Sequence, residues 1–179
     1  MMPNLIKYLP SFLKKEEKTP QVLEDLNAQR GVLWDKINGL KEVLAEMPES
    51  VWRRTDEMQE TFPLTHHFQG GLYTREVFFP KGSLAITLIH KTAHPSFILQ
   101  GEVSFLDDSG VIKRLKTGDK MFTQVGAQRV IYAHKDTRWC CVYKTNKTNV
   151  VEAEDEVYTE YYQTLPKKVL KKYLSVRKQ

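Results

Sequence analysis

The chain of 179 residues is poor in cysteine, glycine and proline, with two, nine and eight of them, and it has no long apolar run. A membrane-spanning helix needs roughly 18 or more consecutive apolar residues, so we expect no membrane span. The first residues lack the basic segment and apolar stretch of a secretory leader, so we expect a cytoplasmic protein. A Gly-x-Ser-x-Gly motif and a phosphate-binding glycine-rich loop are also missing, which gives no support to serine hydrolase or nucleotide hydrolase chemistry.

The two cysteines, Cys140 and Cys141, are adjacent in a segment with the pattern of a strand. Neighbouring side chains on a strand point to opposite faces, so a disulfide between them would be strained. We therefore interpret both as reduced thiols that serve as small apolar strand residues. A metal-binding or redox pair is the alternative.

Charge is unevenly distributed along the chain. The formal net charge is +5, and the remainder of the chain is nearly neutral once the last fourteen residues are set aside. Those residues carry six basic side chains: Lys167, Lys168, Lys171, Lys172, Arg177 and Lys178. A basic run is usually a solvated face, so we do not expect direct nucleic-acid binding.

Residues 1–60 have the pattern of a helical arm. Thr19 is a candidate N-cap, and Pro20 suits the first helical position. Farther along, apolar residues recur at helical spacing and form one stripe: Leu33, Ile37, Leu40 and Leu44. The stripe must pack either on the same chain or on a second copy, and the sequence pattern leaves both possibilities open. We favour dimerisation and expect a homodimer or a higher homo-oligomer.

From Phe62 the pattern changes to short strand-like runs separated by turn residues. The candidate strands are residues 73–79, 84–90, 96–100, 102–106, 121–124, 130–133 and 138–143. Regularly spaced short strands favour an antiparallel barrel or jelly roll over residues 62–148. Residues 149–179 are predicted to be a C-terminal tail, acidic and then basic, with a short helix. The predicted fold class is therefore mainly β.

The spacing of particular residues within this segment resembles the two sequence motifs of the cupin superfamily. The first motif corresponds to Gly82, Leu88, His90, His94 and Gly101, and the second to Gly118, Gln124, Gly126, Arg129 and Ala133. Every interval fits, and the resemblance covers about half of the chain. It implies a cupin-type double-stranded β-helix, with an N-terminal helical arm and a short C-terminal helix, in which the pocket is lined by His90, His94 and Arg129.

The resemblance also implies a metal site, but several of its ligand positions are replaced. A typical cupin holds Fe, Mn, Zn or Ni with two or three histidines and a glutamate, whereas here Leu88, His94 and Arg129 stand at three of these positions. Arginine has no lone pair to donate and repels a nearby cation. We therefore expect no cofactor. The alternative is a divalent metal held by His90 and His94, with a third donor from His66, His67, Gln124 or His134.

A pocket that contains arginine instead of a third histidine suits an anion, because guanidinium offers paired donors to carboxylate or phosphate. Arg75 shares one strand face with Tyr73 by period-two counting, so it either points inward or pairs outward with a surface acid. The predicted ligand-binding residues are Tyr73, Arg75, His90, His94, Gln124 and Arg129. The predicted partner is a small anionic ligand, with a nucleotide-like ligand as one option.

A second, fainter resemblance links residues 66–68, 71–76, 89–91 and 132–139 to small cupin-like proteins of phages and prophages. It implies a role such as a sponge that sequesters a nucleotide immune signal in the host cytoplasm. The favoured interpretation is thus a non-catalytic binding protein. The alternative is a metal-dependent enzyme of the dioxygenase, isomerase or lyase class that uses His90 and His94.

Overall fold

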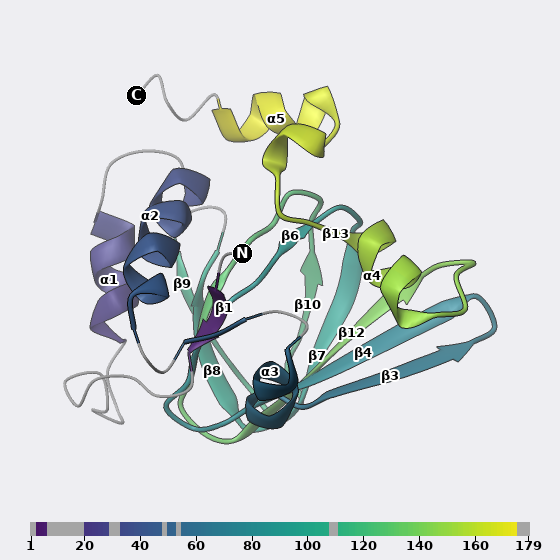
Figure 1. Cartoon of the computed structure of the whole chain (residues 1–179), viewed down its shortest axis with the longest axis horizontal. Coiled ribbons are helices and arrows are strands. Elements are labelled where there is room, and N and C mark those ends of the chain that lie inside the picture. The colour runs from purple at the N-terminus through teal and green to yellow at the C-terminus, as the bar shows by residue number, and fades with distance from the viewer. Residues whose placement is uncertain are drawn as a thin grey trace.

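Two antiparallel sheets form the body of the molecule (Figure 1). The computed structural model describes residues 3–6, 20–28, 33–47, 50–52, 55–107 and 111–174. The first sheet has the order β2 (Ser50–Trp52), β1 (Pro3–Ile6), β5 (Leu84–Ile86), β11 (Val130–Ala133), β8 (Glu102–Leu106) and β9 (Ile112–Lys116). The second has the order β10 (Lys120–Thr123), β7 (His94–Gln100), β12 (Thr137–Lys144), β4 (Leu72–Phe79) and β3 (Leu64–Gln69).

The chain passes repeatedly from one sheet to the other between β4 and β12, which is the connectivity of a jelly roll. A third, two-stranded sheet pairs β6 (Ile89–His90) with β13 (Tyr158–Thr159). The helices are α1 (Gln21–Ala28), α2 (Leu33–Ala45), α3 (Asp56–Thr61), α4 (Val150–Val157) and α5 (Lys167–Leu174), with a short 3-10 helix at Tyr162–Thr164. The predicted mainly β, cupin-type jelly roll with flanking helices is confirmed.

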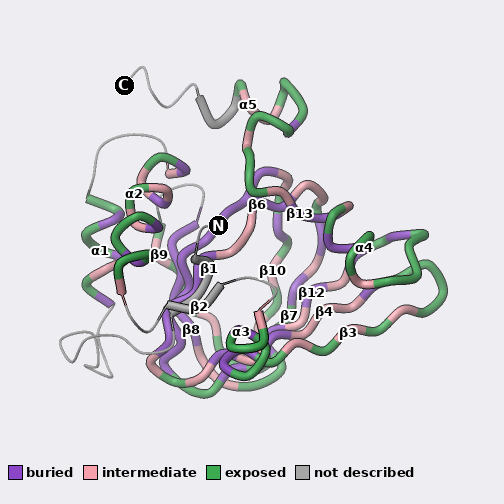
Figure 2. The backbone as a smooth tube through the Cα atoms, in the orientation of Figure 1, coloured by how far each residue is buried: buried purple, intermediate pink, exposed green. Residues whose placement is uncertain are grey.

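Strand β11 is buried along its whole length and shows how both faces of the first sheet are covered. In Figure 2, much of the backbone of this sheet, around the strand labelled β8, is buried. Alternate residues on a strand point to opposite faces. Ile131 and Ala133 belong to the core between the two sheets, whereas Val130 and Tyr132 pack in a second core against α1 and α2. The arm therefore covers the outer face of the first sheet.

The apolar stripe of α2 packs on its own chain. Ile37 and Leu44 are buried with strand residues Leu84 and Val130, and Leu33 and Leu40 pack at the edge of this cluster. The stripe therefore needs no second copy to bury it, which removes the observation that favoured dimerisation. Homo-oligomer formation stays a prediction.

The arm differs from the prediction in containing two strands. Strand β1 pairs antiparallel with both β2 and β5, so residues expected to be helical extend the first sheet instead. The backbone N–H and C=O groups at the edge of β5 pair with β1, and the helical periodicity of the arm sequence gives no sign of such pairing. The candidate N-cap Thr19 lies outside the described residues.

Most predicted strands are present, and the two that were missed within residues 62–148 are edge strands. Strand β8 and strand β11 have the predicted bounds, whereas β3 and β9 were not expected. Strand β3 reads LTHHFQ and β9 reads IKRLK, so both are dominated by polar residues because one face meets solvent. The run 84–90 is also divided into β5 and β6.

The segment after the last barrel strand folds back onto the barrel (Figure 1). Ala153 and Val157 of α4 are fully buried in the core between the sheets. Farther along, Tyr162 stacks on Trp34 of α2 with ring centroids 5.0 Å apart, and Trp34 Nε1 donates to Gly126 O at 3.1 Å. The predicted tail is therefore part of the folded unit. No helix of the described residues is long and apolar enough to cross a membrane.

Candidate functional site

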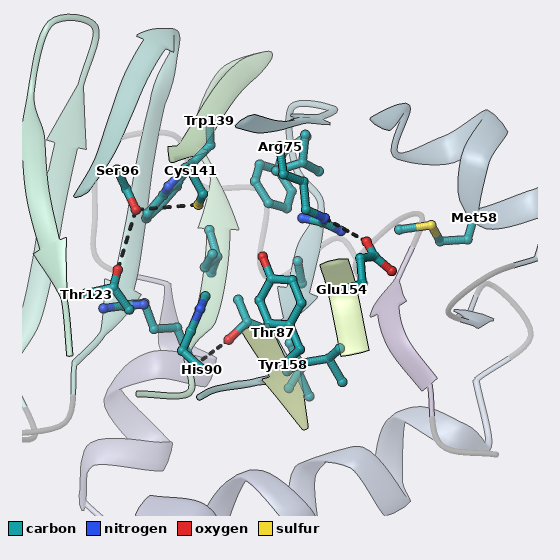
Figure 3. A pocket seen from close by; sticks show the side chains of 17 residues that line it. Met58, Arg75, Thr87, His90, Ser96, Thr123, Trp139, Cys141, Glu154 and Tyr158 are labelled. Carbon is teal, nitrogen blue, oxygen red and sulfur yellow. Dashed lines mark hydrogen bonds and ion pairs between the residues drawn. The ribbon is translucent and has the colours of Figure 1, made fainter. Parts of the chain in front are cut away.

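A cavity of about 90 Å³, partly open to solvent, lies in the barrel between the two sheets. Both sheets contribute to its wall, and Met58 of α3, Glu154 of α4 and Tyr158 of β13 complete it (Figure 3). Most lining side chains are apolar, including Val77, Phe79, Ile131 and Trp139. The few polar groups therefore determine what the cavity can hold.

Arg75 points into the barrel and pairs with a carboxylate there (Figure 3). Its Nε donates to Glu154 Oε1 at 3.0 Å, and its guanidinium carbon lies 5.5 Å from the centre of the Tyr158 ring. Burial works against the charged guanidinium, but Tyr158 and Glu154 keep the pKa of Arg75 above its ordinary value. Of the two orientations that the sequence left open for Arg75, the inward one is observed, and its acidic partner comes from α4.

A hydrogen-bonded pair of tyrosines connects the cavity wall to His90. Tyr143 OH lies 2.5 Å from Tyr158 OH and 3.5 Å from His90 Nδ1. Burial raises the pKa of Tyr158 to about 12 and that of Tyr143 well above its usual range. Both tyrosines therefore remain neutral at ordinary pH.

His90 and His94 lie side by side, with ring centroids 4.7 Å apart. His90 lines the cavity, and His94 lies beside it against the Tyr143 ring. Burial lowers the pKa of His94 to about 4 and that of His90 well below its usual value, and the charge of Arg129 lowers both further. The two imidazoles are therefore neutral at pH 7.

The residues at this position do not fit a tightly bound divalent metal. His94 Nδ1 lies 3.1 Å from Thr92 O, which can only accept, so Nδ1 donates and Nε2 holds the lone pair. That Nε2 is buried without a hydrogen-bond partner among the described residues. However, two imidazoles are too few, and the positive charge of Arg129 opposes a cation. No group of three or more His, Cys, Asp or Glu suited to a metal occurs in the described ranges.

Arg129 is the second guanidinium in the cavity wall. Arg129 directly precedes β11, and the residue is buried, with 4% of its surface exposed. Its guanidinium carbon lies 5.4 Å from the centre of the Phe105 ring. Its backbone N–H donates to Thr87 Oγ1 at 2.9 Å, which fixes this residue against the chain before β6. Of the three residues predicted to line one pocket, His90 and Arg129 do so, whereas His94 lies beside His90 and is not among the lining residues.

Two predicted binding residues are placed elsewhere. Tyr73 is fully buried in the core, where its hydroxyl lies 2.8 Å from His66 Nδ1 and its ring stacks on Phe68. Gln124 is exposed after β10. Neither residue lines the cavity. Tyr73 follows the inward face of β4 as predicted, but it is too far along the strand to reach the cavity.

Sequence reasoning missed Glu154 and Tyr158, which supply the acid and the ring that face Arg75. Both lie beyond the last barrel strand, in a stretch assigned to a separate tail. Their spacing of four residues was a usable signal, because it places two side chains on one side of a helical turn. Nothing in that spacing, however, identifies a partner on β4.

Acid is expected to destabilise the protein through its buried histidines. His94 and His134 have pKa values lowered to about 4 by burial, and that of His90 is lowered well below 6.5. Below pH 6.5 the unfolded chain binds protons that the native state does not bind, so stability falls between pH 6.5 and pH 4, by up to about 1.4 kcal/mol per pH unit for each histidine. Urea unfolding at pH 7 and pH 5 measures this loss.

The matched variants are His94→Gln and His67→Gln, because His67 is exposed on β3. The first should reduce the difference in unfolding free energy between the two pH values, and the second should leave it unchanged. Equal stability of the parent protein at pH 7 and pH 5 would contradict the buried neutral state of these imidazoles.

Comparison with known proteins gives fold-level likeness alone. No protein-family model matches the chain, and no curated protein matches it significantly in sequence. Similar solved structures include an acetylacetone dioxygenase from Acinetobacter johnsonii, at 12% identity and a TM-score of 0.41, covering 47% of this chain and 60% of that one. An ectoine synthase from P. lautus matches at 14% identity and a TM-score of 0.45, covering 53% and 71% of the two chains.

A third similar structure is the cupin domain of a transcriptional regulator from Enterobacter cloacae, at 10% identity and a TM-score of 0.41, covering 48% of this chain and 98% of that one. The match spans only 60% of the length of the dioxygenase. These proteins differ in function, and none of their activities transfers on such likeness. The order of the strands within the two sheets identifies the fold of the chain as a cupin-type jelly roll.

Proposed function

We propose that the protein is a non-catalytic binding module that holds a small anionic ligand in the barrel cavity. The observation that supports this most directly is the charge of the wall. Two guanidinium groups, those of Arg75 and Arg129, line the cavity with one carboxylate, that of Glu154, in the described part of the chain. Because His90 is neutral, the basic side chains among the described lining residues outnumber the acidic one.

The largely apolar surface of the wall strengthens the attraction between these guanidinium groups and an anion. Attraction between opposite charges is stronger where the surroundings are less polarisable than water. The cavity wall offers few other polar groups, such as Thr87 and the linked hydroxyls of Ser96 and Thr123, whose oxygens lie 3.4 Å apart. An anion therefore gains more from this cavity than a neutral or cationic molecule of the same size.

The size of the cavity argues against a nucleotide inside it. Pockets for ligands of drug size enclose roughly 300–1,000 Å³, and an engineered cavity of about 150 Å³ holds one benzene. This cavity measures about 90 Å³. The nucleotide-like part of the predicted ligand, and with it the phage sponge, is therefore not part of the proposal.

The test is a thermal-shift screen of the purified chain against acetate, propionate, butyrate and phosphate, with Mn²⁺, Zn²⁺ and AMP as further arms. A ligand that binds only the native state raises the melting temperature. We expect a small carboxylate at about one hundred times its Kd to raise it by several degrees. Arg129→Gln should abolish this shift, because it removes the guanidinium group that we propose binds the carboxylate.

The matched control is Arg138→Gln, since Arg138 is exposed on β12 and pairs with Glu76 outside the barrel. That variant should keep the full shift. The proposal fails if Arg129→Gln responds like the parent protein to every anion. A shift produced by a metal and removed by His90→Ala would replace it with the metal-dependent alternative.

A further inference from the structure

The outer face of the second sheet carries exposed apolar side chains where strands β7 and β10 pair. Phe97 and Leu99 of β7 are 37% and 47% exposed, and Phe122 of β10 is 71% exposed. Their neighbours Ser96 and Thr123 point to the opposite face and line the cavity. The three exposed side chains, the β7–β10 patch, therefore lie on the side of these strands that faces away from the cavity.

The pairing register makes the β7–β10 patch continuous. Strand β10 runs antiparallel to β7, with Lys120 opposite Phe97 and Phe122 opposite Pro95. Diagonal neighbours on one face of a sheet are within reach of aromatic side chains, so Phe122 lies next to Phe97. Leu99 follows Phe97 by two residues on the same strand. Continuous apolar surface indicates an interaction site, whereas single exposed apolar residues are common.

The first sheet shows the contrast. Its outer face is covered by the arm of its own chain, which buries Val130 and Tyr132. The stripe of α2 that first suggested a second copy is buried in the same cluster. Other exposed apolar side chains lie on separate elements, as Val43 on α2 and Val151 on α4 do. The β7–β10 patch is therefore the better candidate for contact with another molecule.

The area of the β7–β10 patch suits a weak, reversible dimer. The exposed fractions of Phe97 and Phe122 together equal about one whole phenylalanine, or roughly 150–250 Å² of apolar surface. Weak complexes bury less than about 600 Å² on each partner, of which a little more than half is non-polar. The two rings thus supply about half of the apolar area that such an interface needs, and Leu99 adds to it.

The charges beside the patch favour a second copy of this chain as the occupant. A two-fold interface places one surface against itself, so a charge at its centre would meet the same charge. Phe97 has Lys120 opposite it on β10 and Cys140 opposite it on β12. Cys140 in turn has Glu76 opposite it on β4. This row across the sheet therefore runs from a lysine, through two uncharged residues, to a glutamate.

A two-fold axis between Phe97 and Cys140 makes this row complementary to itself. It places Lys120 of each copy over Glu76 of the other copy, with the uncharged residues between them. Arg138 Nε donates to Glu76 Oε1 at 2.6 Å within one chain, so the flank that receives Lys120 has no excess positive charge. A partner with one uniform charge would not match flanks that differ in this way.

We infer that the protein forms a reversible homodimer through the β7–β10 patch, in which the outer faces of two second sheets pack on each other. The dimer does not depend on the cavity or its ligand, because the patch is on the opposite face of the strands. It places the contact between copies on the sheet rather than on the arm.

Sedimentation velocity of the full chain over a range of micromolar concentrations tests the dimer. The parent protein should pass from monomer to dimer with a dissociation constant in the micromolar range. Phe122→Glu places a charge in the apolar patch and should raise that constant by about tenfold or more. Phe97→Thr, which keeps a residue suited to a strand, should weaken the dimer in the same direction. Since both phenylalanines are exposed, both variants should fold.

The matched control is Val43→Glu, which places the same charge at an exposed apolar residue of α2. It should leave the dissociation constant unchanged. A parent protein that stays monomeric at every concentration would overturn the inference, because the patch would then serve another partner or none. A dimer weakened by Val43→Glu but not by Phe122→Glu would place the interface on the arm. A dimer that none of the three variants weakens would also contradict the β7–β10 interface.

Discussion

Replacing Glu154 by leucine is expected to lower the free energy of unfolding by about 3 kcal/mol or more, since removing one partner of a buried ion pair leaves the other charge uncompensated. Arg75 would remain in the barrel with its positive charge facing Tyr158 and an apolar wall. The figure lies at the lower end of the usual range because 18% of the Arg75 side chain is exposed and water partly screens its charge. Urea unfolding at pH 7 measures the effect.

The double variant Arg75→Met with Glu154→Leu should recover most of that loss. Apolar side chains of similar volume often replace a buried ion pair without a net cost. Glu152→Gln, on the exposed side of α4, serves as the control and should leave the stability nearly unchanged. A double variant as unstable as Glu154→Leu alone would show that packing of the glutamate, rather than its charge, stabilises α4.

Replacing Gly101 by alanine is expected to destabilise the barrel by about 3 kcal/mol, or to prevent folding. Gly101 has φ 89°, which costs an alanine roughly 1–2 kcal/mol. An added Cβ would also collide with backbone, lying 2.7 Å from Thr137 Cα and still closer to Asp136 O. Backbone atoms cannot rotate away, so the sheet itself would have to shift.

Gly118→Ala separates the two causes of destabilisation, which are the strain of a positive φ and the collision of an added Cβ with backbone. Gly118 has φ 90°, but no heavy atom lies within 4 Å of an added Cβ. Its substitution should therefore cost only the backbone strain, about 1–2 kcal/mol, and thermal unfolding should rank it between the parent protein and Gly101→Ala. Equal losses for the two variants would contradict the steric account of Gly101.

The barrel was predictable because its signals are local. Turn residues and alternating strands set the fold class, and the glycine spacing placed Gly82, Gly101, Gly118 and Gly126 at turns where each has a positive φ. Period-two alternation also placed Leu88 and His90 on the interior face, and both line the cavity. Patterns of this kind require no knowledge of what lies across the barrel.

The rest of the site depends on contacts between distant parts of the chain. Arg75 and Glu154 are 79 positions apart, and the sequence leaves the partner of Arg75 open between a surface acid and an inward contact. The volume of the cavity is set by how Tyr158 and the core side chains pack, and small changes of packing decide it. Strands β3 and β9 escaped detection for a simpler reason, since solvent on one face permits polar residues.

The segment that returns to the barrel after β12 forms a portion of the cavity wall that can change in sequence independently of the two large sheets. Glu154 and Tyr158 complete the cavity although neither belongs to either large sheet. Substitutions there can alter the charge and depth of the cavity while every strand of the two large sheets keeps its sequence. Descendants of such a chain could therefore acquire a new ligand by changing α4 and β13, with the scaffold conserved beneath them.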